Sequence, residues 1–251
     1  MLCKNNLVKE GERIDDLQYD GLRIIQNPSL YCFTSDAVLL ANFVKATKKD
    51  VVVDLGTGSG IIATIVATKT NAKKVYGVEI QPYMSDMASR SVKLNGLEDK
   101  IEIINRPMQT AFEVLGKESC SVVTCNPPYQ KIGAGEKQLT EEIAISRHEV
   151  KVTLEEIVVS ASTLLKYGGK FYVIHQAKRL AELTYLLEKH NLRVKKITMI
   201  QPKANKNVDT VIVEAAKFGK VGLIIPPPLV VFNDDGTPTR EVEKIYRNDE
   251  R

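Results

Sequence analysis

From residue 51 onward, short apolar runs of strand length alternate with longer segments that have helical apolar spacing. This alternation is typical of βαβ units, in which helices join parallel strands by right-handed crossovers. We therefore predict an α/β fold with a seven-stranded, mostly parallel sheet and helices on both faces. The predicted strands are Val51–Leu55, Lys74–Glu79, Ile101–Asn105, Ser121–Cys125, Lys170–His175, Val194–Gln201 and Thr210–Ala215. The predicted helices are Ile61–Thr70, Tyr83–Leu94, Leu154–Tyr167 and Ala177–Lys189.

A shorter segment lies on each side of the alternating part. We divide the chain into an N-terminal extension (1–34), a core (35–216) and a C-terminal tail (217–251). In the extension we expect a hairpin over Leu17–Ile25, with Asp20-Gly21 as its turn. Ser35 is a good N-cap for a helix over Ala37–Lys45. The hairpin and this helix should cover the functional edge of the sheet.

Two further stretches lack the periodicity of helices and strands. Gln130–Arg147 carries glycines and charges and predicts a long loop, of the kind that compact domains keep mainly for binding. The tail after Pro226-Pro227-Pro228 has polar turn residues and predicts little regular structure.

Composition narrows the class of protein without deciding its function. At 251 residues with 43% hydrophobic content, the chain can bury one sizeable core. No apolar stretch approaches the ~18 residues of a membrane span, and a formal charge of +4 suits a polyanionic partner or a metabolic enzyme equally. The cysteines lack the spacing of a zinc site and the density of a disulfide scaffold. We expect a cytoplasmic protein with no membrane or metal partner, a monomer or weak dimer, with buried reduced thiols at Cys3, Cys32, Cys120 and Cys125.

The segment Asp54–Gly60 is a glycine-rich turn between a buried strand and a helix, which is how α/β folds present a nucleotide site. Glu79 ends the next strand, where a carboxylate can accept hydrogen bonds from both hydroxyls of a ribose. The turn lacks the third glycine of dinucleotide enzymes. Asp54 suits a cofactor with an amino-acid end, because its carboxylate would orient loop amides or a water near the ammonium group of that end. A tight turn in an unrelated α/β protein is the alternative. The predicted cofactor-binding residues are Asp54, Gly56, Thr57, Gly58, Gly60, Glu79, Ile80, Met108 and Asn126.

A second motif, Asn126-Pro127-Pro128-Tyr129, follows the fourth predicted strand. An exocyclic amine on an aromatic ring is a poor nucleophile because its lone pair is delocalised. Hydrogen bonds from its two N–H groups to the Asn126 side-chain oxygen and the Pro127 carbonyl would localise that lone pair for attack on a sulfonium methyl. Tyr129 can stack on the base, which contributes roughly 1–3 kcal/mol. These four residues are the predicted catalytic set, and no general base is required.

Both motifs resemble those of the class I, Rossmann-like methyltransferases: Asp54–Gly60 resembles their cofactor motif and Asn126–Tyr129 their catalytic motif. Gly21–Pro28, Phe33–Ala41 and Arg147-His148-Glu149 further resemble the bacterial tRNA adenine methyltransferases that modify the adenosine next to the anticodon of a valine tRNA. This resemblance covers nearly the whole chain. It implies S-adenosylmethionine as methyl donor, tRNA as partner and N6-methyladenosine as product.

One departure from the family pattern concerns the third predicted strand. Many relatives follow it with an aspartate that contacts the adenine of the cofactor, whereas this chain has Asn105-Arg106-Pro107-Met108. We therefore expect backbone amides near Met108 to contact that adenine.

The residues assigned to the substrate lie outside the two motifs, apart from Tyr129. Arg147 and His148 would order the long loop or meet phosphate, and a structural role is the alternative. Lysines in loops expected on the face of the active site would contact RNA backbone or simply remain solvated. The predicted substrate-binding residues are Phe33, Asp36, Tyr129, Lys131, Arg147, His148, Lys203 and Lys206.

Three other functions fit the sequence less well. A protein glutamine-N5 methyltransferase needs the same activation of an amide nitrogen by Asn126 and Pro127. An rRNA or DNA adenine-N6 methyltransferase shares the base, although a dedicated DNA-recognition domain has no obvious room in this length. A non-catalytic RNA-binding scaffold would not need Asp54, Glu79 and the Asn126–Tyr129 motif together.

Overall fold

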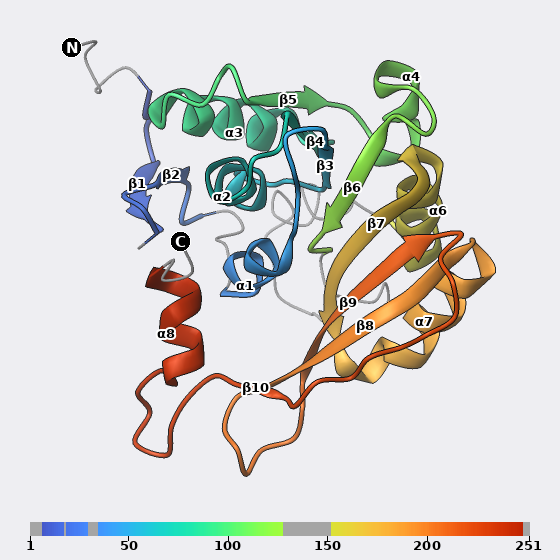
Figure 1. Ribbon diagram of the computed structural model, residues 1–251. Coiled ribbons are helices and arrows are strands. Elements are labelled where there is room, and N and C mark those ends of the chain that lie inside the picture. The colour runs from blue at the N-terminus through green and yellow to red at the C-terminus, as the bar shows by residue number, and fades with distance from the viewer. Residues whose placement is uncertain (1–6, 18, 30–34, 128–151, 248–251) are drawn as a thin grey trace, which may run out of the picture.

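The computed structural model describes residues 7–17, 19–29, 35–127 and 152–247, and these form the predicted α/β arrangement (Figure 1). The central sheet has the strand order β10-β8-β9-β7-β6-β3-β4-β5. β9 runs antiparallel to both of its neighbours, and the other adjacent pairs are parallel. The strands are β3 (Val51–Leu55), β4 (Lys74–Glu79), β5 (Ile101–Asn105), β6 (Cys120–Cys125), β7 (Leu165–Gln176), β8 (Leu192–Gln201), β9 (Thr210–Lys217) and β10 (Leu229–Val230).

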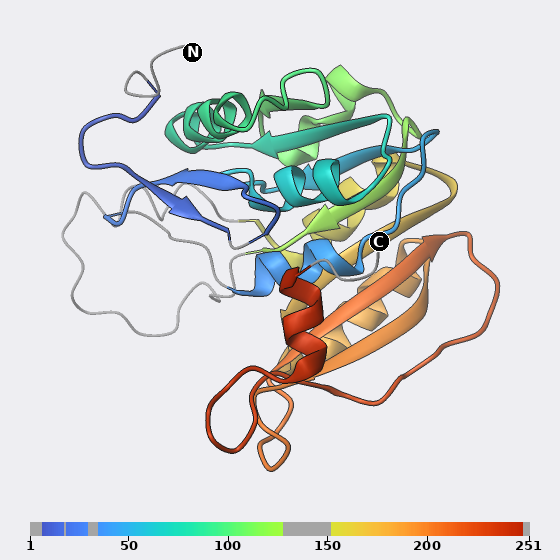
Figure 2. The ribbon, with the colours of Figure 1, turned by 60° about the vertical axis from the view of Figure 1, so that its left-hand side comes forward.

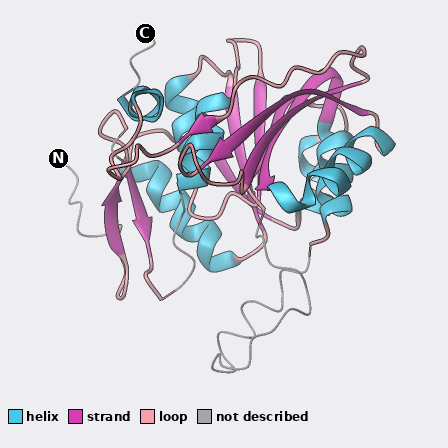
Figure 3. Cartoon of the chain, turned by 90° about the horizontal axis from the view of Figure 1, so that it is seen from below, coloured by secondary structure: helices cyan, strands magenta, loops and turns pink. Residues whose placement is uncertain are grey.

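Helices cover both faces of this sheet (Figure 3). Side chains alternate along each strand, so that Val52 belongs to the hydrophobic cluster with α1 and α2, whereas Val53 belongs to the cluster with α6 and α7. The helices are α1 (Ser35–Phe43), α2 (Ile61–Lys69), α3 (Pro82–Leu94), α4 (Phe112–Leu115), α6 (Leu154–Leu164), α7 (Leu180–Lys189) and α8 (Arg240–Arg247). Short 3-10 helices precede α4 at Met108–Thr110 and α7 at Ala177–Arg179.

The N-terminal hairpin has the predicted turn but different strands. Asp20 and Gly21 both adopt left-handed backbone conformations, with φ of 48° and 70°. The strands are β1 (Arg13–Asp16) and β2 (Arg23–Gln26), so the hairpin begins before Leu17. β2 lies beside α3 (Figure 2). The Ile25 N–H donates to Ser91 Oγ at 3.0 Å.

The sheet contains eight strands rather than the seven predicted, and the tail is more ordered than expected. Leu229–Val230 pairs with the end of β8 to form β10. At the start of α8, the Thr239 hydroxyl accepts the Val242 N–H. The Val242 side chain is buried, with 4% of its surface exposed. Neither element was predicted. A two-residue strand next to three prolines gives almost no periodic signal, whereas the eight-residue α8 was missed although Val242, Ile245 and Tyr246 have helical spacing.

Three predicted helices have different bounds in the structure. The helix expected to end at Tyr167 ends at Leu164, because Leu165 already pairs with Cys120 of β6. The register then shifts between Cys120 and Val122, and Gly168 takes a left-handed φ of 72°. The helix expected from Ala177 is split into a 3-10 turn followed by α7. α1 spans Ser35–Phe43, so it includes the predicted cap residue and ends before Lys45.

The described part of the chain holds no helix that is both long and apolar enough to cross a membrane. Within the same residues, no group of three or more His, Cys, Asp or Glu side chains could hold a metal ion. Cys120 and Cys125 are buried free thiols, as predicted, and burial raises the pKa of Cys120 to about 12. Cys3 and Cys32 lie outside the described residues.

Candidate active site

The two motifs meet at the carboxyl edge of the sheet. β3 and β6 are adjacent parallel strands, and their last residues, Leu55 and Cys125, face each other in the register. Neighbouring strands lie about 4.8 Å apart. Because Gly56 follows Leu55 and Asn126 follows Cys125, the glycine-rich loop begins one strand spacing from Asn126. Ligands in open α/β sheets bind at this edge.

The loop after β3 needs its glycines for their backbone conformation. Gly56, Gly58 and Gly60 have φ of 69°, 58° and 89°, a region that other residues rarely adopt. At Gly60 a Cβ would also lie 3.3 Å from the Ala88 Cβ of α3. The loop therefore passes close to α3 at the buried Gly60, whereas Gly56 is exposed.

Glu79, at the end of β4, holds this loop through its carboxylate. Its Oε2 accepts the Gly58 N–H at 2.9 Å, and its Oε1 accepts the Gln81 N–H at 2.9 Å. Burial raises the pKa of the Glu79 carboxyl, against the lowering effect of these backbone hydrogen bonds. Each carboxylate oxygen can accept a second hydrogen bond. Glu79 can thus fix the loop and still accept both hydroxyls of a ribose.

Asp54 is hydrogen-bonded to two threonine side chains. Its Oδ2 accepts the Thr57 hydroxyl and its Oδ1 accepts the Thr124 hydroxyl, both at 2.6 Å. Both of these partners are hydroxyl groups, and the orientation of loop amides or of a water near the cofactor remains a prediction. Asp54 has no exposed surface, and this burial raises the pKa of its carboxyl to about 7.

Two residues that shape the site were not predicted from the sequence. Thr124 looked like an ordinary strand residue, and only the pairing of β3 with β6 places it opposite Asp54. Gly77 lies inside β4, where a Cβ would come within 2.8 Å of Ile103 Cδ1 and 2.9 Å of Thr57 Cγ2. An isolated glycine within a strand is the one signal that could have identified such a close approach.

The end of β5 forms the side of the site predicted to meet adenine. The Asn105 side chain donates to the carbonyl oxygens of Glu79 and Ile80, at 2.8 and 3.0 Å. The Met108 Cε lies 3.7 Å from where a Cβ on Gly56 would stand, so this side chain borders the loop. Cofactor contact through the Met108 amide and Ile80 remains a prediction.

The predicted catalytic and substrate residues are only partly described. Asn126 is half-buried and Pro127 is buried at the end of β6. Six predicted residues lie outside the described residues: Phe33, Pro128, Tyr129, Lys131, Arg147 and His148.

Three predicted substrate residues can be placed. Asp36 lies in the first turn of α1, near enough to α8 to raise the pKa of Tyr246, after the larger effect of burial. Lys203 and Lys206 follow β8 and therefore lie on the same edge of the sheet as Asn126, as expected. In the strand order, β8 is three strands from β6, or about 14 Å. The Lys203 Nζ donates to the Asp234 carbonyl at 3.0 Å, and Lys206 is exposed.

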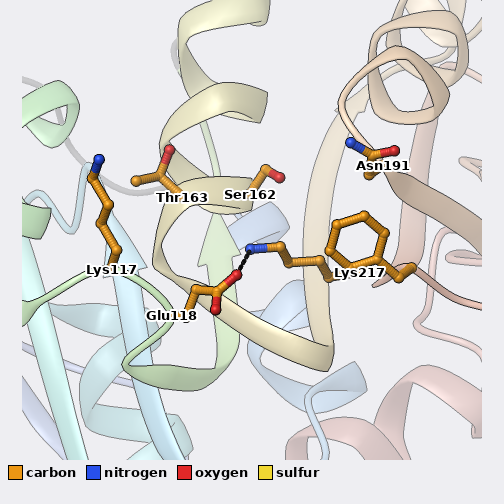
Figure 4. Close-up of a pocket in the computed structure, with 7 residues that line it drawn as sticks. Lys117, Glu118, Ser162, Thr163, Asn191 and Lys217 are labelled. Atoms are coloured by element: carbon orange, nitrogen blue, oxygen red, sulfur yellow. Dashed lines mark hydrogen bonds and ion pairs between the residues drawn. The ribbon is translucent and has the colours of Figure 1, made fainter.

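A hollow of about 510 Å³ lies at the opposite edge of the sheet (Figure 4). The Lys217 ammonium, at the end of the antiparallel strand β9, donates to Glu118 Oε1 at 2.9 Å and to the Leu165 carbonyl at 2.8 Å. The hollow is lined by Lys117, Glu118, Ser162, Thr163, Asn191, Lys217 and Phe218. Because Glu118 precedes β6 and Asn191 precedes β8, this hollow is remote from the strand ends that carry the two motifs.

The model of the methyltransferase small domain family matches residues 22–205 of this sequence. The chain belongs to the methyltransferase small domain family. The matched region contains the glycine-rich loop, Glu79 and Asn126.

Two relatives of this family member are named for different activities. A tRNA1(Val) (adenine(37)-N6)-methyltransferase of Porphyromonas gingivalis is 27% identical over 165 residues, which cover 64% of this chain and 63% of that protein. A protein of Methanocaldococcus jannaschii, provisionally named a protein N5-glutamine methyltransferase, is 34% identical over 123 residues, covering 48% of this chain and 58% of that protein. In both cases the similarity spans less than two thirds of the relative.

Among solved structures, a predicted O-methyltransferase from Agrobacterium tumefaciens matches with a TM-score of 0.67 and 23% identity. The match covers 84% of this chain and 95% of that one. This family member therefore has the Rossmann-like fold of the class I methyltransferases, as the sequence predicted.

Proposed function

We propose that this protein transfers a methyl group from S-adenosylmethionine to N6 of an adenosine in tRNA. The observation that carries the proposal is the register of β3 with β6, which brings the glycine-rich loop next to Asn126. Methyl transfer requires the donor and the acceptor nitrogen to be held in line at short range, and positioning of this kind can supply several kcal/mol.

The residues present fit S-adenosylmethionine. Glu79 is a buried carboxylate with acceptor capacity for a ribose, and Gly56 presents exposed loop backbone that can meet an amino-acid end. Met108 borders Gly56, on the side that would receive the adenine. When bound, this cofactor supplies an electrophilic methyl group on a positively charged sulfur.

Asn126 and Pro127 act on the substrate amine. Its two N–H groups donate to the Asn126 side-chain oxygen and the Pro127 carbonyl, which concentrates the lone pair on the nitrogen. The methylated nitrogen is acidic enough to lose its proton to water, so the reaction needs no side chain with a tuned pKa. Proline fixes the backbone after Asn126 and aims its own carbonyl without offering a competing N–H.

A tRNA substrate is the choice that agrees with the Porphyromonas gingivalis relative and with the mildly basic sequence. The target is the adenosine next to the anticodon of a valine tRNA, and the reaction takes place in the cytoplasm. A base in an anticodon loop is already partly unstacked, so presenting it costs less than extracting one from a duplex. Lys203 and Lys206 lie on the same edge as Asn126 and contact the RNA backbone.

The test supplies the protein with methyl-labelled S-adenosylmethionine and a set of separated acceptors. We expect label in an unmodified valine tRNA transcript and none when the adenosine next to the anticodon is replaced by guanosine. Purified release factor tests the protein-glutamine alternative, which the Methanocaldococcus jannaschii relative favours. Ribosomal RNA and DNA complete the set. Label in release factor alone, or in ribosomal RNA or DNA alone, would overturn the proposed substrate.

A further inference from the structure

A buried chain of hydrogen bonds joins the two halves of the candidate active site. The Thr57 hydroxyl, in the glycine-rich loop, donates to one oxygen of Asp54, and the Thr124 hydroxyl, in β6, donates to the other. Both distances are 2.6 Å, which is within the usual range for a hydroxyl group that donates to a carboxylate. Asp54 and Thr124 have no exposed surface, and Thr57 is 7% exposed.

The position of this bridge along the strands matters for the reaction. Asp54 and Thr124 face each other in the register of β3 with β6. Thr124 lies one residue before the end of β6 and two residues before Asn126. Thr57 lies directly before Gly58, whose N–H is held by Glu79. One carboxylate therefore ties the loop that would hold the methyl donor to the strand that presents Asn126.

We propose that Thr124 is a positioning residue for methyl transfer, acting through Asp54 on the separation between the cofactor loop and Asn126. Backbone pairing alone fixes β3 against β6 as far as Leu55 and Cys125. The Asp54–Thr124 hydrogen bond adds a side-chain tie directly before this last pair, and the Asp54–Thr57 hydrogen bond carries that tie past Leu55 into the glycine-rich loop. A displacement of about 1 Å in a reacting group can cost about a hundredfold in rate.

The decisive variant is Thr124→Val, which keeps the shape of the side chain and removes its hydroxyl. We expect kcat at saturating cofactor to fall at least tenfold, while the calorimetric Kd for S-adenosylmethionine stays within about twofold. Thr124→Ser restores the hydroxyl and should return kcat to within about twofold of wild type. Thr64→Val is the matched control, because Thr64 is also fully buried and its hydroxyl has no partner in the described part of the chain.

Hydrogen exchange gives a readout that does not depend on turnover. The peptide covering residues 120–127 should exchange faster in Thr124→Val than in Thr64→Val. If Thr124→Val does not fold, Thr124→Cys replaces the hydroxyl by a weaker donor of similar size. Its kcat should fall by a smaller factor, and its Kd for S-adenosylmethionine should again stay unchanged.

A double-mutant cycle tests the path through the shared carboxylate. Thr57→Val and Thr124→Val should together lower kcat by less than the product of their separate effects, because either change breaks the same bridge. Independent effects, or a Thr124→Val enzyme with wild-type kcat and exchange, would overturn the inference.

This inference rests on the proposed function, and the same assays distinguish the two failures. A wild-type protein that binds no S-adenosylmethionine, or methylates none of the acceptors, would remove the proposed function. If the wild-type enzyme is active and the Thr124→Val variant is equally active, only the positioning role of Thr124 is contradicted.

Discussion

Replacing Asp54 by asparagine should change how the stability of the protein depends on pH. Burial raises the pKa of the Asp54 carboxyl from its ordinary value of 3.8 to about 7. The folded state therefore holds this proton more tightly than the unfolded state. The associated stability is fully present below pH 3.8 and is lost as the pH rises to about 7. At about 1.4 kcal/mol per pKa unit, the loss amounts to about 4 kcal/mol.

The Asp54→Asn side chain has nearly the same shape and stays neutral at every pH. Its amide can accept from one threonine hydroxyl and donate to the other, so both Thr57 and Thr124 keep a partner. Relative to wild type, the variant should gain up to about 4 kcal/mol of unfolding free energy between pH 4 and pH 8. Urea unfolding at several pH values measures this difference directly.

Asp50→Asn is the matched control with the opposite sign. The Asp50 carboxylate accepts from the N–H and the hydroxyl of Thr47, at 2.8 and 2.7 Å, and its pKa is lowered from 3.8 despite the opposing effect of burial. That contribution is present above pH 3.8 and is lost as the pH falls further. A difference between Asp54→Asn and wild type that does not change with pH would refute the reasoning about burial.

Three further predictions concern the site itself. Asn126→Ala should abolish turnover and leave the Kd for S-adenosylmethionine within a few-fold of the wild-type value, because the partner of Asn126 is the substrate amine. Calorimetry and a labelling assay check this, and a fully active variant would contradict the assigned role. Glu79→Ala removes the acceptor of the Gly58 N–H and of the ribose, so the Kd should rise at least tenfold; an unchanged calorimetric Kd would count against ribose binding. Gly77→Ala places a methyl group within 2.9 Å of two side chains and should lower the unfolding free energy by about 1–3 kcal/mol; urea unfolding tests it, and wild-type stability would show that Thr57 and Ile103 can move aside.

Much of the fold could be predicted because its sequence signals are local. The apolar run of β3, followed by Gly56, Gly58 and Gly60, indicates a strand, a turn and a helix without any knowledge of the rest of the chain. Asp20-Gly21 likewise predicts its turn, since both residues tolerate the left-handed conformation.

The remaining features depend on contacts between distant parts of the chain. β10 exists only because β8 offers an edge to pair with, and β7 begins at Leu165 because Cys120 lies beside it. The role of Asp54 could not be predicted for the same reason: its partner Thr124 lies 70 residues away and has no motif of its own. Glu79 was correctly singled out as a strand-end carboxylate, whereas its hold on Gly58 required the folded loop.

The most direct measurement of the central claim is nucleoside mass spectrometry of a valine tRNA transcript after incubation with the protein and S-adenosylmethionine. The account predicts one N6-methyladenosine, in the fragment that contains the anticodon, formed by wild type and Thr64→Val but not by Asn126→Ala. Unmethylated tRNA under conditions in which the protein demonstrably binds the cofactor would contradict it.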